Sequence, residues 1–212
     1  MFQIPRDQPV GDMKSLLIFT LFLLFCACSI IKTEPVEQNS ITITIDNQDR
    51  IRFSGKGAGA GMMMSASMGA MGVAIGVAID EGIAKEVHES YVTSGGDFSE
   101  LVKAETSTWL ASTCNADQTV SKSFCQPSSN LSIKVYRYGF VTTSGEDDPV
   151  KAELDIGFVL TEQPELRLNL KNTSDAPKAP LEAVKENGNV TFELLSQSYQ
   201  ILLENYENSL SN

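Results

Sequence analysis

Val150-Lys-Ala-Glu-Leu-Asp-Ile-Gly-Phe-Val-Leu160 is the stretch of sequence that decides the fold, because apolar residues occupy every second position in it. Successive side chains of a strand point to opposite faces of a sheet, so the pattern predicts a strand with one buried and one wetter face. The same alternation occurs over residues 131–136 and 166–171. Short polar turns at 144–149 and 162–164 separate these stretches, which predicts an antiparallel meander of three strands.

Helical patterns flank the predicted meander. Asp97, with a glutamate three residues later, matches a capping box that begins one helix. Pro180 begins a short helix that Gly188 ends, and a last helix over about 190–210 carries apolar residues at steps of three and four. Such helices can cover the apolar face of the meander. The sequence therefore predicts an α+β domain over 97–212 with helices on one face of the sheet.

Two smaller segments precede this domain in the expected mature chain. Residues 28–40 are mostly polar and predict a tether. Residues 41–54 contain two short runs in which isoleucine or phenylalanine alternates with other residues, separated by Asp46-Asn47-Gln48-Asp49. This pattern predicts a β-hairpin over 41–54.

Residues 55–90 differ in composition from the rest of the chain and predict a single apolar helix. Residues 55–82 hold eight of the 15 glycines, and residues 62–71 hold five of the seven methionines. No charged residue or proline occurs from 57 to 79. At about 1.5 Å per residue, such a helix would reach about 34 Å, enough for the hydrocarbon core of a bilayer.

Small residues recur along this segment at spacings of four, four, three and four, which places them on one face of a helix. In lipid, a face of small residues lets helix backbones approach closely. The expected membrane and self-association face consists of Gly61, Ser65, Gly69, Gly72 and Gly76. Two alternatives are a buried helix in a soluble core and a flexible linker, and the valines and isoleucines after Gly72 argue against the linker.

The N-terminal region predicts a signal peptide over residues 1–27. An apolar run from Leu16 to Phe25 follows Lys14, and it has the length of a signal-peptide core. Residues 1–12 fit no signal pattern, so the expected start is Met13. Ala27-Cys28 resembles the lipobox of bacterial lipoproteins, in which the cysteine receives acyl chains such as palmitate and becomes the mature N-terminus. The alternative is an ordinary secretory signal.

Two further features indicate the cellular compartment: the residue after the lipidated cysteine, and the two remaining cysteines. Ser29 resembles the residue found there in lipoproteins of the outer membrane. Cys114 and Cys125 form an even pair separated by ten residues, and an oxidising periplasm favours a disulfide between them. The alternative, a metal site or redox pair, lacks other ligands and the Cys-x-x-Cys spacing.

Residues 69–79 resemble the glycine zippers of several bacterial outer-membrane lipoproteins, including the surface-exclusion lipoproteins of conjugative plasmids. The resemblance covers residues 55–85 and implies helices that enter the membrane and assemble into oligomers. In these families two glycine-rich helices often form a hairpin, whereas 57–79 is too short for two full spans. A weaker resemblance, carried by the alternation in 133–140 and 150–156, links 97–210 to periplasmic domains of auxiliary lipoproteins of ABC transporters.

No motif in the sequence predicts catalysis, a cofactor or a metal site. The only histidine, His88, lies in a charged stretch after the glycine-rich segment, and no P-loop or nucleophile elbow is present. A net charge of −11 argues against nucleic-acid binding. We expect a non-catalytic, lipid-anchored envelope protein whose glycine-rich segment contacts membrane lipid and self-associates. The alternatives are a periplasmic binding module for a transporter or other protein partner, and a membrane-active toxin or immunity factor.

Overall fold

The computed structural model describes residues 41–45, 50–116, 125, 130–142, 149–161, 163–170 and 176–210. All of them belong to one unit of the chain, Gln38–Asn212. The expected signal peptide, the lipidation site Cys28 and the tether over 28–40 lie outside the described residues.

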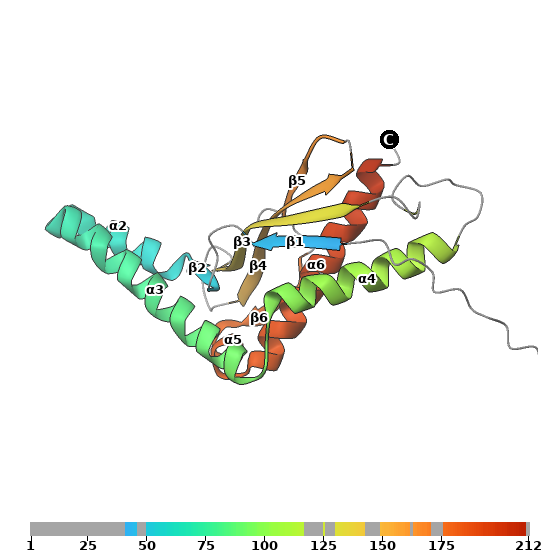
Figure 1. Ribbon diagram of the computed structural model, residues 1–212. Coiled ribbons are helices and arrows are strands. Elements are labelled where there is room, and N and C mark those ends of the chain that lie inside the picture. The colour runs from blue at the N-terminus through green and yellow to red at the C-terminus, as the bar shows by residue number, and fades with distance from the viewer. Residues whose placement is uncertain are drawn as a thin grey trace, which may run out of the picture. The chain divides into compact units, whose positions relative to one another are not determined.

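The three predicted strands are neighbours in a six-stranded mixed sheet (Figure 1). β3 (Leu131–Thr142) pairs antiparallel with β4 (Pro149–Leu160), and β4 pairs antiparallel with β5 (Leu166–Asn169). A short strand, β6 (Lys178–Pro180), pairs with the first residues of β4. The predicted α+β class is confirmed.

The predicted β-hairpin over 41–54 is corrected by the pairing of its two strands. β1 (Ile41–Ile45) and β2 (Arg52–Ser54) both pair with β3, and both run parallel to it. Parallel neighbours need a long crossover connection, and the helices between β2 and β3 supply it. Alternation identified the strands correctly but carries no information about the partner of each strand.

A β-bulge in β3 changes which residues face the core. Val135 is paired with Ile156 and Arg137 with Asp155, so Tyr136 is the extra residue. Before the bulge the odd-numbered residues of β3 are buried, and after it Tyr138 and Phe140 are buried. The bulge therefore leaves Tyr136 and Arg137 together outside the core.

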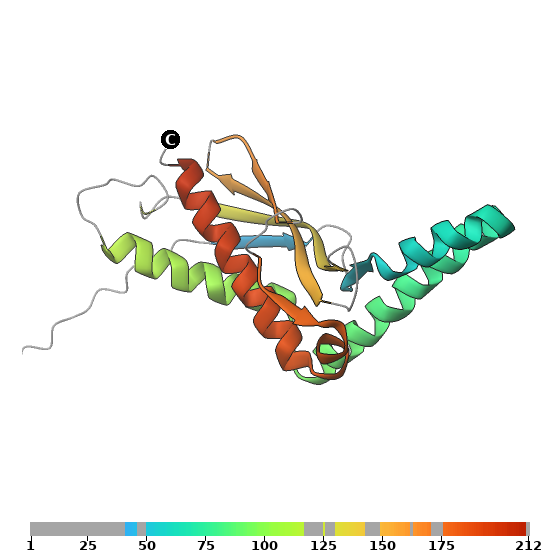
Figure 2. The ribbon, with the colours of Figure 1, turned by 180° about the vertical axis from the view of Figure 1, so that it is seen from behind.

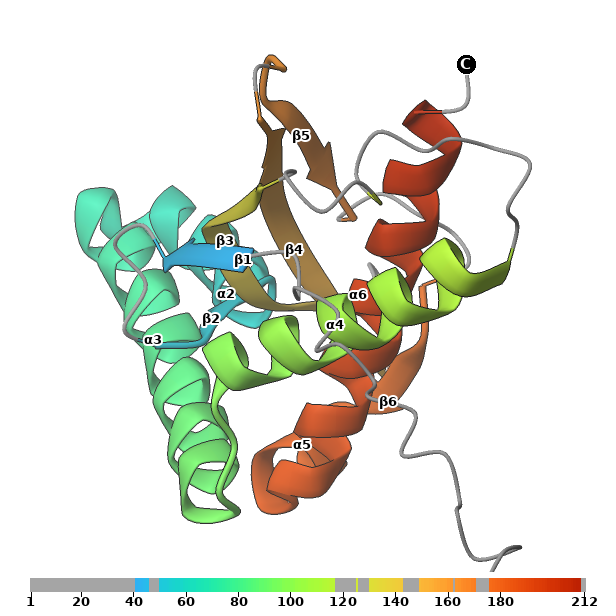
Figure 3. The ribbon, with the colours of Figure 1, turned by 45° about the vertical axis from the view of Figure 1, so that its right-hand side comes forward.

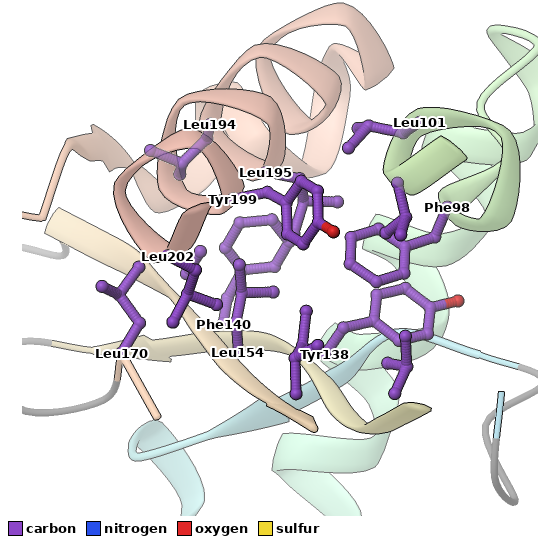
Figure 4. Packing of buried hydrophobic residues seen from close by; sticks show 14 of the residues in the cluster. Phe98, Leu101, Tyr138, Phe140, Leu154, Leu170, Leu194, Leu195, Tyr199 and Leu202 are labelled. Carbon is purple, nitrogen blue, oxygen red and sulfur yellow. The ribbon is translucent and has the colours of Figure 1, made fainter. Parts of the chain in front are cut away.

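α4 (Phe98–Ala116) and α6 (Gly188–Leu210) cover the apolar face of the sheet, and α5 (Leu181–Glu186) packs beside α6. Their apolar side chains form one core cluster with those of β3 and β4, and Figure 4 shows α4 and α6 contributing to it. Phe98 of α4 stacks on Tyr138, with ring centroids 4.2 Å apart. Phe158 of β4 stacks on Tyr206 of α6 at 4.5 Å.

The core also includes residues that precede the domain boundary expected at residue 97. Ile51, just before β2, and Phe53, within β2, are buried in the same cluster. Val87 and Tyr91 join it from the helix α3 (Ala70–Thr93), which also lies beside α5 (Figure 3). The α+β domain therefore extends back through α3 and β2 to the parallel strand β1.

Candidate functional site: a glycine-packed hairpin

The glycine-rich segment forms two helices that lie side by side, rather than the expected single helix (Figures 1 and 2). α2 (Lys56–Met68) ends at Gly69, and α3 begins at Ala70. Gly69 has φ 58° and ψ −132°, a conformation that glycine adopts at little cost and other residues avoid. Gly69 is therefore the turn of a helical hairpin and not a member of a continuous helical face.

Backbone-to-backbone packing of glycines holds the two helices together. A Cβ atom on Gly76 would overlap the carbonyl oxygen of Gly57, and one on Gly72 would lie 2.5 Å from the backbone nitrogen of Ser65. A Cβ on Gly61 would have ordinary contacts, the nearest at 3.4 Å. We call these residues of the helix–helix contact the glycine seam: Gly57, Gly61, Ser65, Gly72 and Gly76.

Four of the five residues predicted for the membrane face, all except Gly69, thus lie in contacts within the chain. The small residues of α2 face those of α3, and this is the close approach that the spacing favours. Contact between copies through the seam would require the hairpin to open. The seam is therefore occupied within one molecule, and only the outer surface of the hairpin is open to a partner.

Asp80 of α3 fixes the other end of the hairpin to the start of α2. Its carboxylate accepts hydrogen bonds from the backbone N–H groups of Gly55, at 3.1 Å, and Gly57, at 2.6 Å. These groups are unpaired in an isolated helix, and the N-terminus of a helix attracts negative charge. Asp80 is the first charged residue after the stretch 57–79, and its carboxylate caps the N-terminus of a different helix.

We expect Asp80→Ala to destabilise α2 by about 1–2 kcal/mol, because two N–H groups at its N-terminus lose their acceptor. Hydrogen exchange of the α2 amides measures this local loss. Glu81→Ala is the matched control, since the exposed Glu81 makes a 3.7 Å ion pair with Arg50, and such surface pairs contribute little. Equal exchange rates in the two variants would contradict the capping role.

The outer surface of the hairpin is apolar and exposed. Among the residues whose side chains the structure describes, ten large hydrophobic side chains are exposed, and eight of them lie between Met62 and Ile79 on α2 and α3. Met62 and Met63 are 76% and 83% exposed. The eight are Met62, Met63, Met64, Met68, Met71, Val73, Val77 and Ile79. Exposed apolar patches of this kind mark protein or membrane contacts.

Within the described part of the chain, no helix has both the length and the apolar character needed to cross a membrane.

The sulfur atoms of Cys114 and Cys125 lie 2.10 Å apart, which is the distance of a disulfide bond. Cys114 is in the last turns of α4, and Cys125 precedes β3. Both contact a small apolar cluster formed by Leu110 and Leu160. The pair therefore connects the end of α4 to the sheet.

We expect reduction of this pair to lower the free energy of unfolding by about 2–4 kcal/mol, because the bond restricts the unfolded chain. Urea denaturation with and without dithiothreitol measures the change in midpoint. The double variant Cys114→Ser, Cys125→Ser should unfold at the reduced midpoint and show no response to dithiothreitol. An unchanged wild-type midpoint after complete reduction would contradict the stabilising role.

The face of the sheet opposite the core carries two ion pairs that sequence analysis missed. Arg137 donates to Glu153 at 3.0 Å, and Arg167 donates to both oxygens of Asp155 at 2.7 and 2.6 Å. The carboxylates of Glu153 and Asp155 are buried, whereas the arginines are partly exposed. The hydrogen bonds to Asp155 raise the pKa of Arg167.

Tyr136, the extra residue of the bulge, connects this face to the residue just before β5. Its hydroxyl donates to Glu165 at 2.7 Å, and the guanidinium of Arg167 lies 4.1 Å from the centre of its ring. Gly157 leaves room for Glu165, because a Cβ there would overlap that carboxylate. Alternation predicted a wetter face. It could not predict the bulge that brings these groups together, because a pattern with a period of two does not reveal an extra residue in one strand.

An open groove of about 570 Å³ between α3 and α5 is lined by acidic residues and Lys185. Lys185 lies 3.0 Å from Glu86 and 3.3 Å from Glu182. The hydrogen bond to Glu86, followed by the one to Glu182, raises the pKa of Lys185. The pair with Glu86 connects α5 to α3 and so supports the attachment of the hairpin to the domain, whereas the pair with Glu182 lies within α5.

The described residues show no candidate metal centre. They contain no group of three or more His, Cys, Asp or Glu side chains placed to hold a metal ion. His88 lies half-buried on α3, and its Nδ1 has no hydrogen-bond partner among the described residues. The hairpin surface is therefore the feature that best defines a candidate site.

Comparisons of the chain with protein-family models, curated proteins and solved structures give no significant match.

Proposed function

We propose that the protein is a non-catalytic lipoprotein of the bacterial cell envelope, held by a lipid on Cys28, whose α2–α3 hairpin enters the surface of the outer membrane. The observation that carries this proposal is the concentration of exposed apolar side chains around the turn of the hairpin: eight of the ten among the described residues lie between Met62 and Ile79. A lipid anchor holds the chain beside a membrane, where such a surface can leave water.

The dimensions of the hairpin support entry into one leaflet. α2 has 13 residues and is about 20 Å long at 1.5 Å per residue, while one leaflet contributes about 15 Å of hydrocarbon. Lys56 at one end of α2 and Asp80 beside it provide charged groups that remain near the headgroups. The helices satisfy their backbone hydrogen bonds internally, as lipid requires.

Self-association is proposed through the outer surface of the hairpin, since the glycine seam is used within each molecule. Gly59, on α2 outside the seam, borders open space: a Cβ atom added to it would have no heavy atom within 4 Å. Small residues on an exposed helix surface allow a second helix to approach closely in lipid. Hairpins of neighbouring copies could therefore pack in the leaflet without opening their seams.

Photolabelling tests membrane entry. The mature protein in liposomes that contain a carbene-generating phospholipid should be labelled on residues 62–71 and not on α4 or α6. Met62→Asp with Met63→Asp should abolish the labelling, because burying carboxylates in hydrocarbon is costly. Ser107→Asp with Thr108→Asp adds the same charge to exposed positions of α4 and should leave labelling unchanged. Absence of label on 62–71 in the wild type would refute the proposal.

The second candidate function, docking of a periplasmic protein partner, is favoured by the open face of the sheet. Tyr136, Arg137 and Arg167 form an ordered polar surface there, with the carboxylate partners of both arginines on β4 and that of Tyr136 just before β5. A photo-crosslinking residue in place of Tyr136 should then give one discrete adduct in intact cells. A reporter on Ser107 of α4 serves as the control, and equal patterns from both positions would remove this candidate.

A further inference from the structure

We call residues 62–71, around the turn of the hairpin, the tip, and methionine is its only large apolar residue. From Lys56 to Met71, every large apolar residue is a methionine, although leucine is common elsewhere in the chain. Four of the five are about half exposed or more: Met62, Met63, Met68 and Met71. Leucine would provide similar volume and better-defined packing. Apolarity alone therefore does not account for the choice of thioethers at this position.

The packing of the hairpin does not depend on these side chains. The glycine seam is formed by Gly57, Gly61, Gly72 and Gly76 with the backbone of Met64 and Ser65. The N-terminus of α2 is held by Asp80. The thioethers of Met62 and Met63 lie on the outer surface. A chemical change at these sulfur atoms would alter the surface of the hairpin and leave its internal contacts in place.

We infer that the methionines of the tip are sites of reversible oxidation by peroxides, and that this modification controls the contact of the hairpin with lipid. The sulfur atom attacks one oxygen of a peroxide, an S–O bond forms and the O–O bond breaks. With hydrogen peroxide the second oxygen leaves as water, so sulfur loses two electrons and the peroxide gains them. Methionine sulfoxide reductases reverse this reaction at the expense of thiols.

The consequence for the membrane rests on the proposed function. Oxidation converts a flexible apolar side chain into a polar one. At the tip, where no valine, leucine or isoleucine is present, the four most exposed large apolar side chains of 62–71 would all become polar. The tip should leave the hydrocarbon, while the glycine seam keeps α2 and α3 together. The exposed Val73 and Val77, nearer the domain on α3, are not oxidised and keep their apolar character.

The photolabelling assay tests this inference on the mature protein in liposomes, with hydrogen peroxide as the probe. After treatment, mass spectrometry should locate sulfoxide on Met62, Met63, Met68 and Met71, and labelling of 62–71 should be lost. Helical circular dichroism should be unchanged. Treatment with methionine sulfoxide reductase and a thiol should restore the label. A variant with leucine in place of all five methionines should be labelled before and after peroxide.

The outcomes separate this inference from the proposed function. Absence of label before peroxide refutes membrane entry itself. Labelling that persists after the four sulfoxides have formed overturns the inference and leaves membrane entry standing. Resistance of Met62 and Met63 to oxidation also overturns it, because the sites are then not accessible. Equal loss of label in the leucine variant would assign the effect to lipid damage and overturn it as well.

Discussion

Gly76→Ala is expected to destabilise the hairpin by about 1–3 kcal/mol, although alanine is the better helix former. A Cβ at position 76 would overlap the carbonyl oxygen of Gly57, and backbone atoms cannot rotate away as a side chain would. The two helices must separate to accommodate it. Hydrogen exchange of the α2 amides measures the opening of the hairpin, and thermal unfolding measures the loss of stability.

Gly82→Ala provides the matched control on the same helix. A Cβ at position 82 has no heavy atom within 4 Å, so this variant should be stabilised by up to about 1 kcal/mol through helix propensity alone. The two substitutions are chemically identical and should act in opposite directions. Stabilisation in both variants would show that the glycines are not held against each other.

Deletion of residues 1–93 is expected to abolish folding of the remaining chain. It removes both parallel strands from the edge of β3, together with four large side chains buried in the core: Ile51, Phe53, Val87 and Tyr91. Each buried side chain of this size contributes about 1.5–3 kcal/mol, so the sum approaches the whole stability of a typical domain. Near-ultraviolet circular dichroism and the urea unfolding transition report the loss.

A chain that begins at Gln38 is the control for this deletion, because the unit Gln38–Asn212 contains all of the described contacts. It should unfold cooperatively at the wild-type midpoint. A chain beginning at Ser94 that shows the same cooperative transition would contradict the inclusion of α3, β1 and β2 in the domain.

The elements of the sheet domain could be predicted from sequence because each has a local cause. Alternation over 150–160 follows from the pleat of β4, whose even-numbered residues are buried. Asp97 begins α4 by accepting hydrogen bonds from the N–H groups of Ser99 and Glu100. These signals act within a few residues of the chain, so no knowledge of the tertiary structure is needed to read them.

The remaining features depend on residues far apart in sequence. The isoleucines of β1 alternate in the same way whether the strand pairs with β2 or with β3, so alternation does not identify the partner strand. The partner depends on the crossover through the helices. Gly69 fits the interior of a small-residue pattern, yet its positive φ ends α2. The N-cap formed by Asp80 spans 23 residues to Gly57. Spacing alone could suggest a glycine contact face, but could not show that its partner is the same chain.

The most direct test of the central claim is the depth of the hairpin tip in lipid. An environment-sensitive fluorophore on Cys in place of Ser67, an exposed residue of α2, should be quenched by spin-labelled acyl chains when the mature protein is in liposomes. The same fluorophore in place of Thr93, exposed at the far end of α3, should be quenched by iodide in water. Equal quenching of both positions by iodide, with none by the lipid quencher at position 67, would contradict entry of the hairpin into the membrane.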